Sequence, residues 1–383
     1  MRFGIFMAPF HPPAGQDPIA AIQRDLETVQ LLDRLGYDEV WVGEHHSAGT
    51  EIIPDPMMFI AYAAPQTRHI KLGTGVLSLP YHNPLLVADR AFFLDQLTRG
   101  RFMLGLGPGA LPGDAAMLGI SIEEQRAALE EDTEVLMKLL RFEGPVTHKT
   151  SRYNLVEAES QYRPYSDFDI SVAAIASPTG PRVAGQHGIG LLSIGATSVD
   201  GFDALGYHWN VVEERATEFG QVADRNQWSL VGPMHLAETR EQAIEDVKFG
   251  LNDWCHYTQH VLAAPHFRAA GETFEERVAW VNETGLGVIG TPDDAISQIE
   301  RLEKQSNGGF GAYLMMDHEW ANPRAQQRHY ELFARYVKPR FQGLAKGPLR
   351  MEQRAIGEWE SLGNRVEKAV QAATDSHFGE ADS

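Results

Sequence analysis

Short runs of mostly apolar residues recur along the chain and alternate with segments that have a helical pattern. Such runs are typical of parallel strands that are covered on both faces. In the first helical segment, Asp17 can cap the helix, Pro18 suits its first turn and Gly36 ends it. The eight strands that this pattern predicts are Arg2–Met7, Glu39–Gly43, Ile70–Leu77, Phe102–Gly107, Ile170–Ala174, Gly190–Ile194, Ser229–Ala237 and Gly311–Met316.

Eight strands that alternate with helices predict an α/β fold, a (β/α)8 TIM barrel. Two intervals are too long for simple connections, so we expect insertions after strand 4, at about residues 142–169, and after strand 7, at about 249–287. Insertions of this kind commonly form substrate walls or lids. The barrel should occupy residues 1–344, and residues 345–383 should form a polar, helical C-terminal tail with Trp359 as its one large anchor.

The charge balance narrows the range of partners. The 383 residues include 33 Lys and Arg against 52 Asp and Glu, which gives a formal net charge of -19. Nucleic acid and anionic membranes would be repelled, so a small or neutral ligand is the expected partner. The single cysteine, Cys255, excludes an intrachain disulfide and a zinc site with several cysteine ligands. Without a signal peptide or a long apolar stretch, we expect a cytoplasmic protein.

The end of the second strand carries candidate chemistry, because active sites of β/α barrels lie at the C-terminal ends of the strands. This strand ends in Glu44, His45 and His46. Adjacent residues of a strand point to opposite sides, so at most one of the two histidines faces the barrel mouth. A histidine can serve there as a general acid or base near neutral pH. The alternative is a pair of structural histidines, and no third ligand at suitable spacing indicates a metal site.

The end of the fifth strand has the pattern of an anion site. The segment from Ser177 to Arg182 predicts a tight turn and then the start of a helix, with hydroxyl groups and no acidic residue. Helix N-termini of this kind bind phosphate through free N–H groups and the helix dipole. Arg182 either contributes or is merely solvated. The similar segment from Gly290 to Asp294 has two aspartates that would repel a phosphate, and we interpret it as a helix cap.

The glycine-rich segment from Gly105 to Ala110 matches a dinucleotide-binding fingerprint, but its context argues against that function. The fingerprint must open a helix at once, whereas Leu111 to Asp114 should prolong a loop and the next clear helix should begin near Ser121. Glycines at the end of a barrel strand instead allow a flat ligand to approach the backbone, or simply form a tight loop.

Taken together, these motifs resemble the bacterial luciferase-like flavin monooxygenases, and within them the limonene monooxygenase-like branch. The resemblance rests on Glu44-His45-His46, on the third strand with residues 79–84, on residues 94–102, and on residues 290–293. It covers nearly the whole barrel, and the joint order of the motifs is far more specific than any one of them. It implies a barrel that binds reduced FMN and reacts it with O2 to form a flavin C4a-hydroperoxide.

The resemblance also implies roles for particular residues. His45 falls on the catalytic histidine of the family, and the third strand falls where relatives have a non-proline cis peptide beneath the isoalloxazine. Luciferase itself has a reactive cysteine and then an arginine after strand 4, where this chain has Gly107 and Pro108. The phosphate must then rely more on Arg126 and the strand 5 turn. The cofactor-binding residues so expected are Thr74, Gly75, Val76, Gly107, Arg126, Ser177, Thr179 and Gly180.

We therefore expect a two-component monooxygenase that uses FMNH2 from a separate NAD(P)H:flavin reductase and O2 to oxygenate a small apolar substrate, such as a terpenoid or ketone. The family also favours a homodimer. The alternatives are a deazaflavin (F420)-dependent oxidoreductase on the same fold and a non-catalytic ligand-binding barrel. The chemistry requires a dry pocket. Residues that could line it are Phe6, Met7, Phe10, Trp254 and Tyr257.

Overall fold

The computed structural model describes the chain except for residues 9, 13–15, 199–201, 263–267 and 382–383. The chain divides into two compact units, Met1–Lys338 and Pro339–Ser383. Among the described residues, no helix is both long and apolar enough to cross a membrane.

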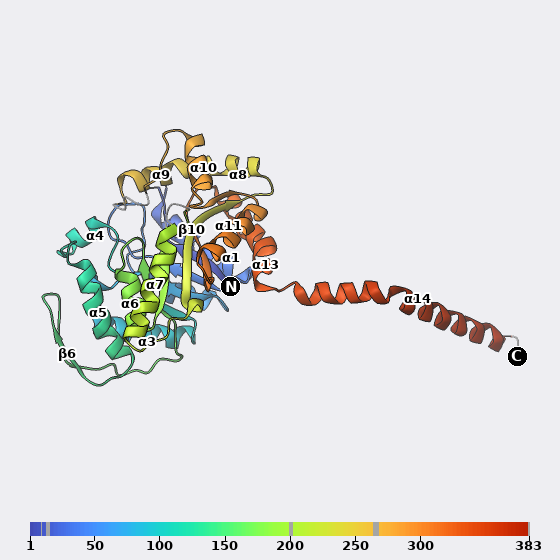
Figure 1. Ribbon diagram of the computed structural model, residues 1–383, viewed down its shortest axis with the longest axis horizontal. Helices are drawn as coiled ribbons and strands as arrows, with labels where there is room; N and C mark the ends of the chain where they lie inside the picture. Colours follow the sequence, from blue (N-terminus) through green and yellow to red (C-terminus); the bar gives the residue numbers. More distant parts are fainter. Residues whose placement is uncertain (9, 13–15, 199–201, 263–267, 382–383) are drawn as a thin grey trace. The chain divides into compact units, whose positions relative to one another are not determined.

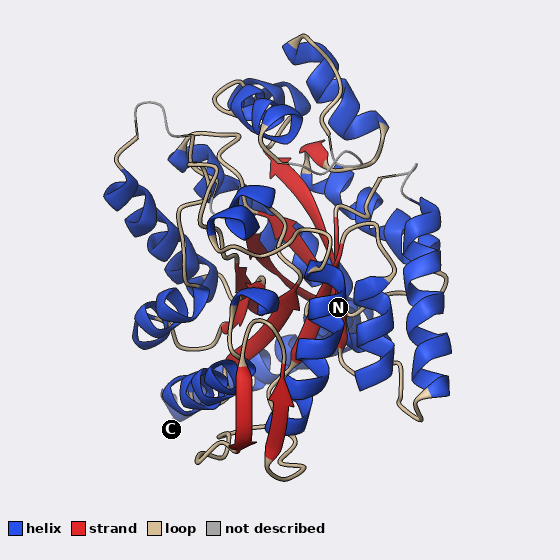
Figure 2. Ribbon diagram, turned by 90° about the vertical axis from the view of Figure 1, so that its left-hand side faces the viewer, coloured by secondary structure: helices blue, strands red, loops and turns tan. Residues whose placement is uncertain are grey.

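The first unit is a closed barrel of eight parallel strands, which confirms the predicted fold. Each strand pairs with the next along the chain, and β12 closes the ring by pairing with both β10 and β1. Figure 2 shows these strands in red with the helices, in blue, around them. The barrel strands are β1 (Arg2–Met7), β2 (Glu39–Val42), β3 (Lys71–Thr74), β5 (Phe102–Gly107), β8 (Ile170–Ala174), β9 (Gly190–Ile194), β10 (Trp228–Leu236) and β12 (Ala312–Met316).

The barrel interior is filled around one large side chain. Trp41 on β2 is only 2% exposed. A Cβ atom on Gly73 would lie 2.6 Å from the Trp41 ring, and one on Gly105 would lie 3.0 Å from it. Glycine at these two positions of neighbouring strands therefore makes room for the indole, as close packing of a core requires.

Two further short strands and one hairpin accompany the barrel. The strand expected over residues 70–77 is interrupted by a cis peptide bond between Gly75 and Val76. It continues as β4 (Leu77–Ser78), which pairs with β5, while β11 (Val288–Gly290) pairs with β10. In the segment 142–169, β6 (Val146–Lys149) and β7 (Asn154–Ala158) form an antiparallel hairpin.

The helices begin where the sequence places their caps. Asp17 accepts a hydrogen bond from the Ile19 backbone N–H at 3.0 Å, and Gly36 follows the helix with a positive φ of 71°. Thr291 and Asp294 form a capping box, which confirms that this segment is a helix cap. The helices of this unit are α1 (Pro18–Arg34), α2 (Pro56–Ala63), α3 (Pro84–Thr98), α4 (Pro112–Met117), α5 (Gln125–Leu140), α6 (Thr179–His187), α7 (Phe202–Glu218), α8 (Arg240–Val247), α9 (Leu251–His260), α10 (Phe274–Glu283), α11 (Pro292–Gln305) and α12 (Pro323–Leu332), with short 3-10 turns at Ala64–Gln66, Leu79–Tyr81 and Arg225–Gln227 and a π turn at Phe333–Val337.

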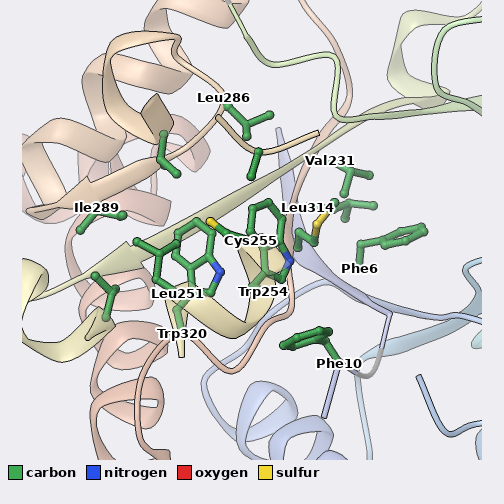
Figure 3. Packing of buried hydrophobic residues seen from close by; sticks show 14 of the residues in the cluster. Phe6, Phe10, Val231, Leu251, Trp254, Cys255, Leu286, Ile289, Leu314 and Trp320 are labelled. Carbon is green, nitrogen blue, oxygen red and sulfur yellow. The ribbon is translucent and has the colours of Figure 1, made fainter. Parts of the chain in front are cut away.

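The insertion after the seventh barrel strand covers an apolar cluster (Figure 3). Trp254 on α9 meets Trp320 edge-on, with ring centroids 5.2 Å apart. Cys255 lies in the same cluster and is fully buried, and burial raises the pKa of its thiol to about 11. The thiol is therefore a packing group, since a reactive cysteine needs a lowered pKa.

The second unit consists mainly of α13 (Lys338–Gln342), which starts at the boundary, and α14 (Lys346–Ala381), drawn in red in Figure 1. Trp359, which we expected to anchor this tail, is 74% exposed.

Candidate active site

A cavity opens at the C-terminal ends of the barrel strands, and its wall is mostly apolar. Phe6, Phe10, Trp254 and Tyr257 line it as expected, whereas Met7 is buried in the core and does not. Polar groups from the loop after β2, from β4, from α9 and from the segment after β12 interrupt this wall. The remaining lining residues are Ala8, Glu44, His45, Glu51, Gly75, Val76, Ser78, Ala110, Ile175, Ile194, Thr258, Leu262, Met316 and Asp317.

His45 lies on the cavity wall between two carboxylates. Its Nδ1 is 3.2 Å from Asp114 Oδ2, and its Nε2 is 2.8 Å from Glu51 Oε2. Burial alone would lower its pKa, but the carboxylates of Glu51 and Asp114 outweigh burial and raise the pKa of His45 to about 10. His45 is therefore an imidazolium ion at neutral pH, with a proton on each nitrogen.

His46 points away from the cavity and belongs to a second network. Its Nε2 lies 3.1 Å from Glu44 Oε1, which also lies 2.7 Å from His82 Nε2. The other oxygen of Glu44 accepts a hydrogen bond from the Ser78 backbone N–H at 2.6 Å. This network connects the ends of the second and third strands. Both histidines lie in the loop beyond the end of β2 at Val42, so their different contacts, not strand alternation, separate them, and His45 alone of the pair lies on the cavity wall.

Asp114 connects several groups of this site, and we did not identify it from the sequence. It is 1% exposed and accepts hydrogen bonds from the Ser47 hydroxyl at 2.6 Å and the His46 backbone N–H at 3.0 Å. Burial tends to raise its pKa, but the hydrogen bonds from His45, Ser47 and His46 lower it overall. The expectation of a plain loop at residues 111–114 was wrong, because the short helix α4 begins at Pro112.

The end of the third strand forms one side of the cavity. Gly75 and Val76, joined by the cis peptide bond, line it directly. Thr74 is fully buried, and its hydroxyl donates to the Gly105 carbonyl at 2.7 Å, so it fixes β3 to β5 instead of facing the cavity. Gly107 does not line the cavity either. A Cβ atom there would lie 2.4 Å from Val76 Cγ2, so this glycine makes room for the Val76 side chain.

The expected phosphate residues gather at the start of α6. The strand β8 ends at Ala174, and α6 begins at Thr179 with no acidic residue in its first turn and no side chain capping it. Ser177 and Thr179 are half-buried there, and Gly180 is buried. Ile175, two residues before Ser177, lines the cavity.

Arg126 is exposed at the start of α5. It lies one helical turn before Glu130, which forms an ion pair at 3.5 Å with Arg182 of α6. Arg126 is therefore on the face of α5 that is directed toward α6. Arg182 is engaged with Glu130, which favours the solvated alternative for this residue. Among the described residues, no group of three or more His, Cys, Asp or Glu side chains is arranged to hold a metal ion.

Comparison with known proteins identifies the family. Residues 1–306 match the luciferase-like monooxygenases. The chain belongs to this family. This luciferase-like protein is 47% identical to limonene 1,2-monooxygenase of Rhodococcus erythropolis over 371 residues, which span 97% of this chain and 94% of that protein. It is also 40% identical to 4-hydroxyprotoasukamycin monooxygenase of Streptomyces nodosus subsp. asukaensis over 354 residues, with 91% and 94% of the two chains covered.

A solved structure shows the same fold. The oxygenating constituent of 3,6-diketocamphane monooxygenase from Pseudomonas putida, solved in complex with FMN, superposes with a TM-score of 0.74 at 24% identity. The match covers 88% of this chain and 98% of that one. The luciferase-like monooxygenases are flavin-dependent oxidoreductases, so the protein is an enzyme and the alternative of a non-catalytic ligand-binding barrel is wrong.

Proposed function

We propose that this enzyme is the oxygenase component of a two-component system. It takes reduced FMN from a separate NAD(P)H:flavin reductase and uses O2 to oxygenate a small, largely apolar molecule of terpenoid or ketone type. The observation that carries the proposal is the cavity itself, in which a cationic imidazole is set in a mostly apolar wall close to an uncapped helix N-terminus. The structural relative described as an oxygenating constituent with FMN supports the same division of labour.

The residues present fit both ends of FMN. At the phosphate end, the first amide N–H groups of α6 have no side-chain cap and no acidic neighbour, and a phosphate can accept hydrogen bonds from them. The hydroxyls of Ser177 and Thr179 add donors, and Arg126 adds a positive charge. At the ring end, the Gly75–Val76 segment offers a flat backbone surface on the cavity wall.

When bound, reduced flavin supplies the two electrons that let O2 give one oxygen atom to the substrate while the other ends in water. Residues of the chain hold and transfer the protons that this reaction needs. A carboxylate faces each ring nitrogen of His45, but Glu51, beside Nε2, lines the cavity and Asp114, beside Nδ1, does not. The Nε2 proton is therefore the one within reach of a ligand in the cavity. His45 is thus a general acid whose charge is maintained by its two carboxylates.

Exclusion of water is the other contribution of the chain. Trp254 and Tyr257 of α9 and Phe10 after β1 form an apolar cover on the cavity, with the rings of Phe10 and Tyr257 5.3 Å apart. A dry site favours oxygenation over the wasteful release of hydrogen peroxide. The insertion after the seventh strand therefore acts as the substrate wall.

Titration of the apoprotein tests the cofactor. FMNH2 and reduced F420 are added separately without oxygen and binding is followed. The samples are then exposed to ¹⁸O2 with a cyclic terpenoid ketone. We expect tight binding of FMNH2 and one ¹⁸O atom in the product only in that sample. Tighter binding of reduced F420 without label in any product would replace this proposal with the deazaflavin alternative.

We also propose a cytoplasmic homodimer. Neighbouring helices α2 and α3 expose large apolar side chains, each more than half exposed, as interaction surfaces commonly do. Light scattering should give twice the mass of the chain, and Phe93→Asp should reduce it to the mass of one chain. An unchanged mass in the variant would show that this surface is not the dimer interface. The apolar side chains are Met58, Tyr62, Leu86, Phe93 and Leu97.

A further inference from the structure

Tyr257 brings a buried hydroxyl to the cavity wall. The residue is 4% exposed, and its hydroxyl oxygen has no hydrogen-bond partner of acceptable geometry among the described residues. Buried hydroxyls are nearly always paired, so this exception calls for an explanation. The Glu51 carboxylate is close enough to raise the pKa of this hydroxyl but does not meet hydrogen-bond geometry with it, so a group that enters the cavity can serve as its partner.

Other polar groups of the same wall are already engaged. The Thr258 hydroxyl donates to the Cys255 carbonyl at 3.0 Å, and Asp317 accepts a hydrogen bond from the Tyr330 hydroxyl at 2.8 Å. His45 and Glu51 form an ion pair with each other. Tyr257 is therefore a buried hydroxyl of this wall with bonding capacity left for a ligand.

The surroundings of Tyr257 favour a ligand atom over a water molecule. An ordered buried water needs two to four polar partners. The cavity wall that includes Tyr257 also offers the rings of Phe10 and Trp254 and the side chain of Leu262. The polar groups that act on Tyr257 are the carboxylates of Glu51 and Asp114, and both already contact His45. Burial first, and the Glu51 carboxylate second, raise the pKa of Tyr257 far above its usual value, so the hydroxyl keeps its proton and can donate it in a hydrogen bond.

We propose that Tyr257 hydrogen-bonds to an oxygen atom that the substrate already carries, so that the preferred substrates are apolar ketones or alcohols and not plain hydrocarbons. The inference rests on the proposed function, because it concerns the substrate of that same site. A hydrocarbon would leave the hydroxyl buried and unpaired. Sites built to pair a polar group of the substrate discriminate strongly against analogues that lack the group.

Three compounds with one carbon skeleton test this directly: p-menthane, menthone and menthol. Binding to the apoprotein is followed through the fluorescence of its tryptophans, of which Trp254 lines the cavity. We expect wild type to bind menthone or menthol at least about tenfold more tightly than p-menthane. Tyr257→Phe keeps the ring and removes the hydroxyl, so it should abolish this preference. The relative affinities of menthone and menthol show which oxygen group is favoured.

The control is Tyr207→Phe, since Tyr207 on α7 is 48% exposed and does not line the cavity. It should keep the wild-type preference. Equal binding of the three compounds to wild type, no binding of any of them, or an unchanged preference in Tyr257→Phe would each overturn the inference. These results are independent of flavin: failure to bind FMNH2 would count against the proposed function, whereas loss of the preference in a protein that binds FMNH2 would count only against the role of Tyr257.

Discussion

At the residue scale, the charge of His45 depends on two carboxylates that hold it from opposite sides. Asp114 contacts Nδ1 and Glu51 contacts Nε2, and both acids are buried. In the proposed function, an imidazolium in this position is expected to stabilise the negative charge that forms as oxygen is reduced and to give up one proton. Its neighbour His46 pairs with Glu44 instead and has no such contact with the cavity.

We predict that His45→Ala lowers the rate of oxygenation by about 100- to 10,000-fold, as the loss of one positioned proton donor does. FMN affinity should change little, because the proposed phosphate site lies at α6, away from His45. His46→Ala is the matched control and should leave product formed per FMNH2 consumed near the wild-type value. The measurement is product and hydrogen peroxide per flavin, together with thermal stability. Near-normal coupling in His45→Ala, or a larger defect in His46→Ala at equal stability, would refute the assignment.

The pH profile tests the two carboxylates. Because the pKa of His45 is about 10, its acid form persists up to that pH, and we predict that oxygenation declines only above it. Glu51→Gln removes one of the charges that raise this pKa. The alkaline limit should then move to lower pH by about one unit or more. The check is kcat/KM against pH for both proteins, and coincident profiles would show that Glu51 does not control this proton.

Of the group formed by His45, Glu51 and Asp114, only the histidine could be predicted from the sequence. Barrel strand ends and side-chain alternation pointed to one of the two histidines, and the family resemblance chose His45. Asp114 is 69 positions away in the chain, and only the fold brings it to the ring. Nothing in the sequence around Glu51 marks it as a partner, because its neighbours form a loop whose path depends on tertiary contacts.

At the element scale, the break between β3 and β4 shapes the cavity. A Cβ atom on Gly75 would lie 2.7 Å from the Trp41 Cβ and 2.9 Å from its backbone carbon. A side chain at this position would therefore collide with the neighbouring strand and would not enter the cavity. Glycine is required here for the packing of the barrel wall.

We predict that Gly75→Ala destabilises the protein by about 1–3 kcal/mol through this overpacking. Gly206→Ala is the control, since Gly206 on α7 has open space around the position of a Cβ atom. Alanine there should be neutral or stabilising by up to about 1 kcal/mol, because it favours helix. Chemical denaturation of both variants measures the difference. If Gly75→Ala is as stable as Gly206→Ala, the packing argument does not hold.

The N-terminus of α6 gives a prediction for flavin binding. The double substitution Ser177→Ala with Thr179→Ala removes two hydroxyl donors and should weaken FMN binding by about 1–3 kcal/mol, while the backbone N–H groups remain. Riboflavin lacks the phosphate, so its affinity should be the same for both proteins. Titration of both proteins with FMN and with riboflavin measures the two affinities. An equal loss of riboflavin affinity in the double variant would show that the phosphate does not bind at α6.

The elements themselves could largely be predicted from the pattern of apolar residues. All eight barrel strands lie where the runs place them, since strands buried on both faces must be apolar throughout. One local feature was missed: α4 at Pro112 is too short to show helical periodicity. The cis peptide bond that splits residues 70–77 has no signature in an apolar run, and it was expected only from the family resemblance.

At the scale of the whole molecule, the closed barrel follows from the count and order of its strands, but the distribution of buried charge does not. Several histidines are buried where protonation is unfavourable. Burial is the main cause that lowers their pKa, to about 3 for His318 and about 4 for His187. The histidines with a lowered pKa are His187, His208, His235, His318 and His329.

Two other histidines have the opposite shift. Their buried carboxylate neighbours outweigh burial and raise the pKa of His11 to about 9 and that of His45 to about 10. Above pH 6.5 the unfolded chain loses these two protons while the folded chain keeps them, so stability falls as the pH rises toward 10. Below pH 6.5 the unfolded chain gains protons that the five lowered histidines cannot accept when folded, so stability falls there too.

We therefore predict that the free energy of unfolding is greatest near pH 6.5, with a slope of up to about 1.4 kcal/mol per pH unit for each histidine involved. Among the described residues, four carboxyl groups whose pKa values are raised by burial oppose the fall on the acid side, against five lowered histidines. They are Asp25, Glu39, Asp132 and Asp317. Denaturation from pH 4 to 10 measures the curve. His187→Asn should flatten only the acid side and Glu51→Gln only the alkaline side. A maximum near pH 9, or the same curve in both variants, would contradict this distribution of buried charge.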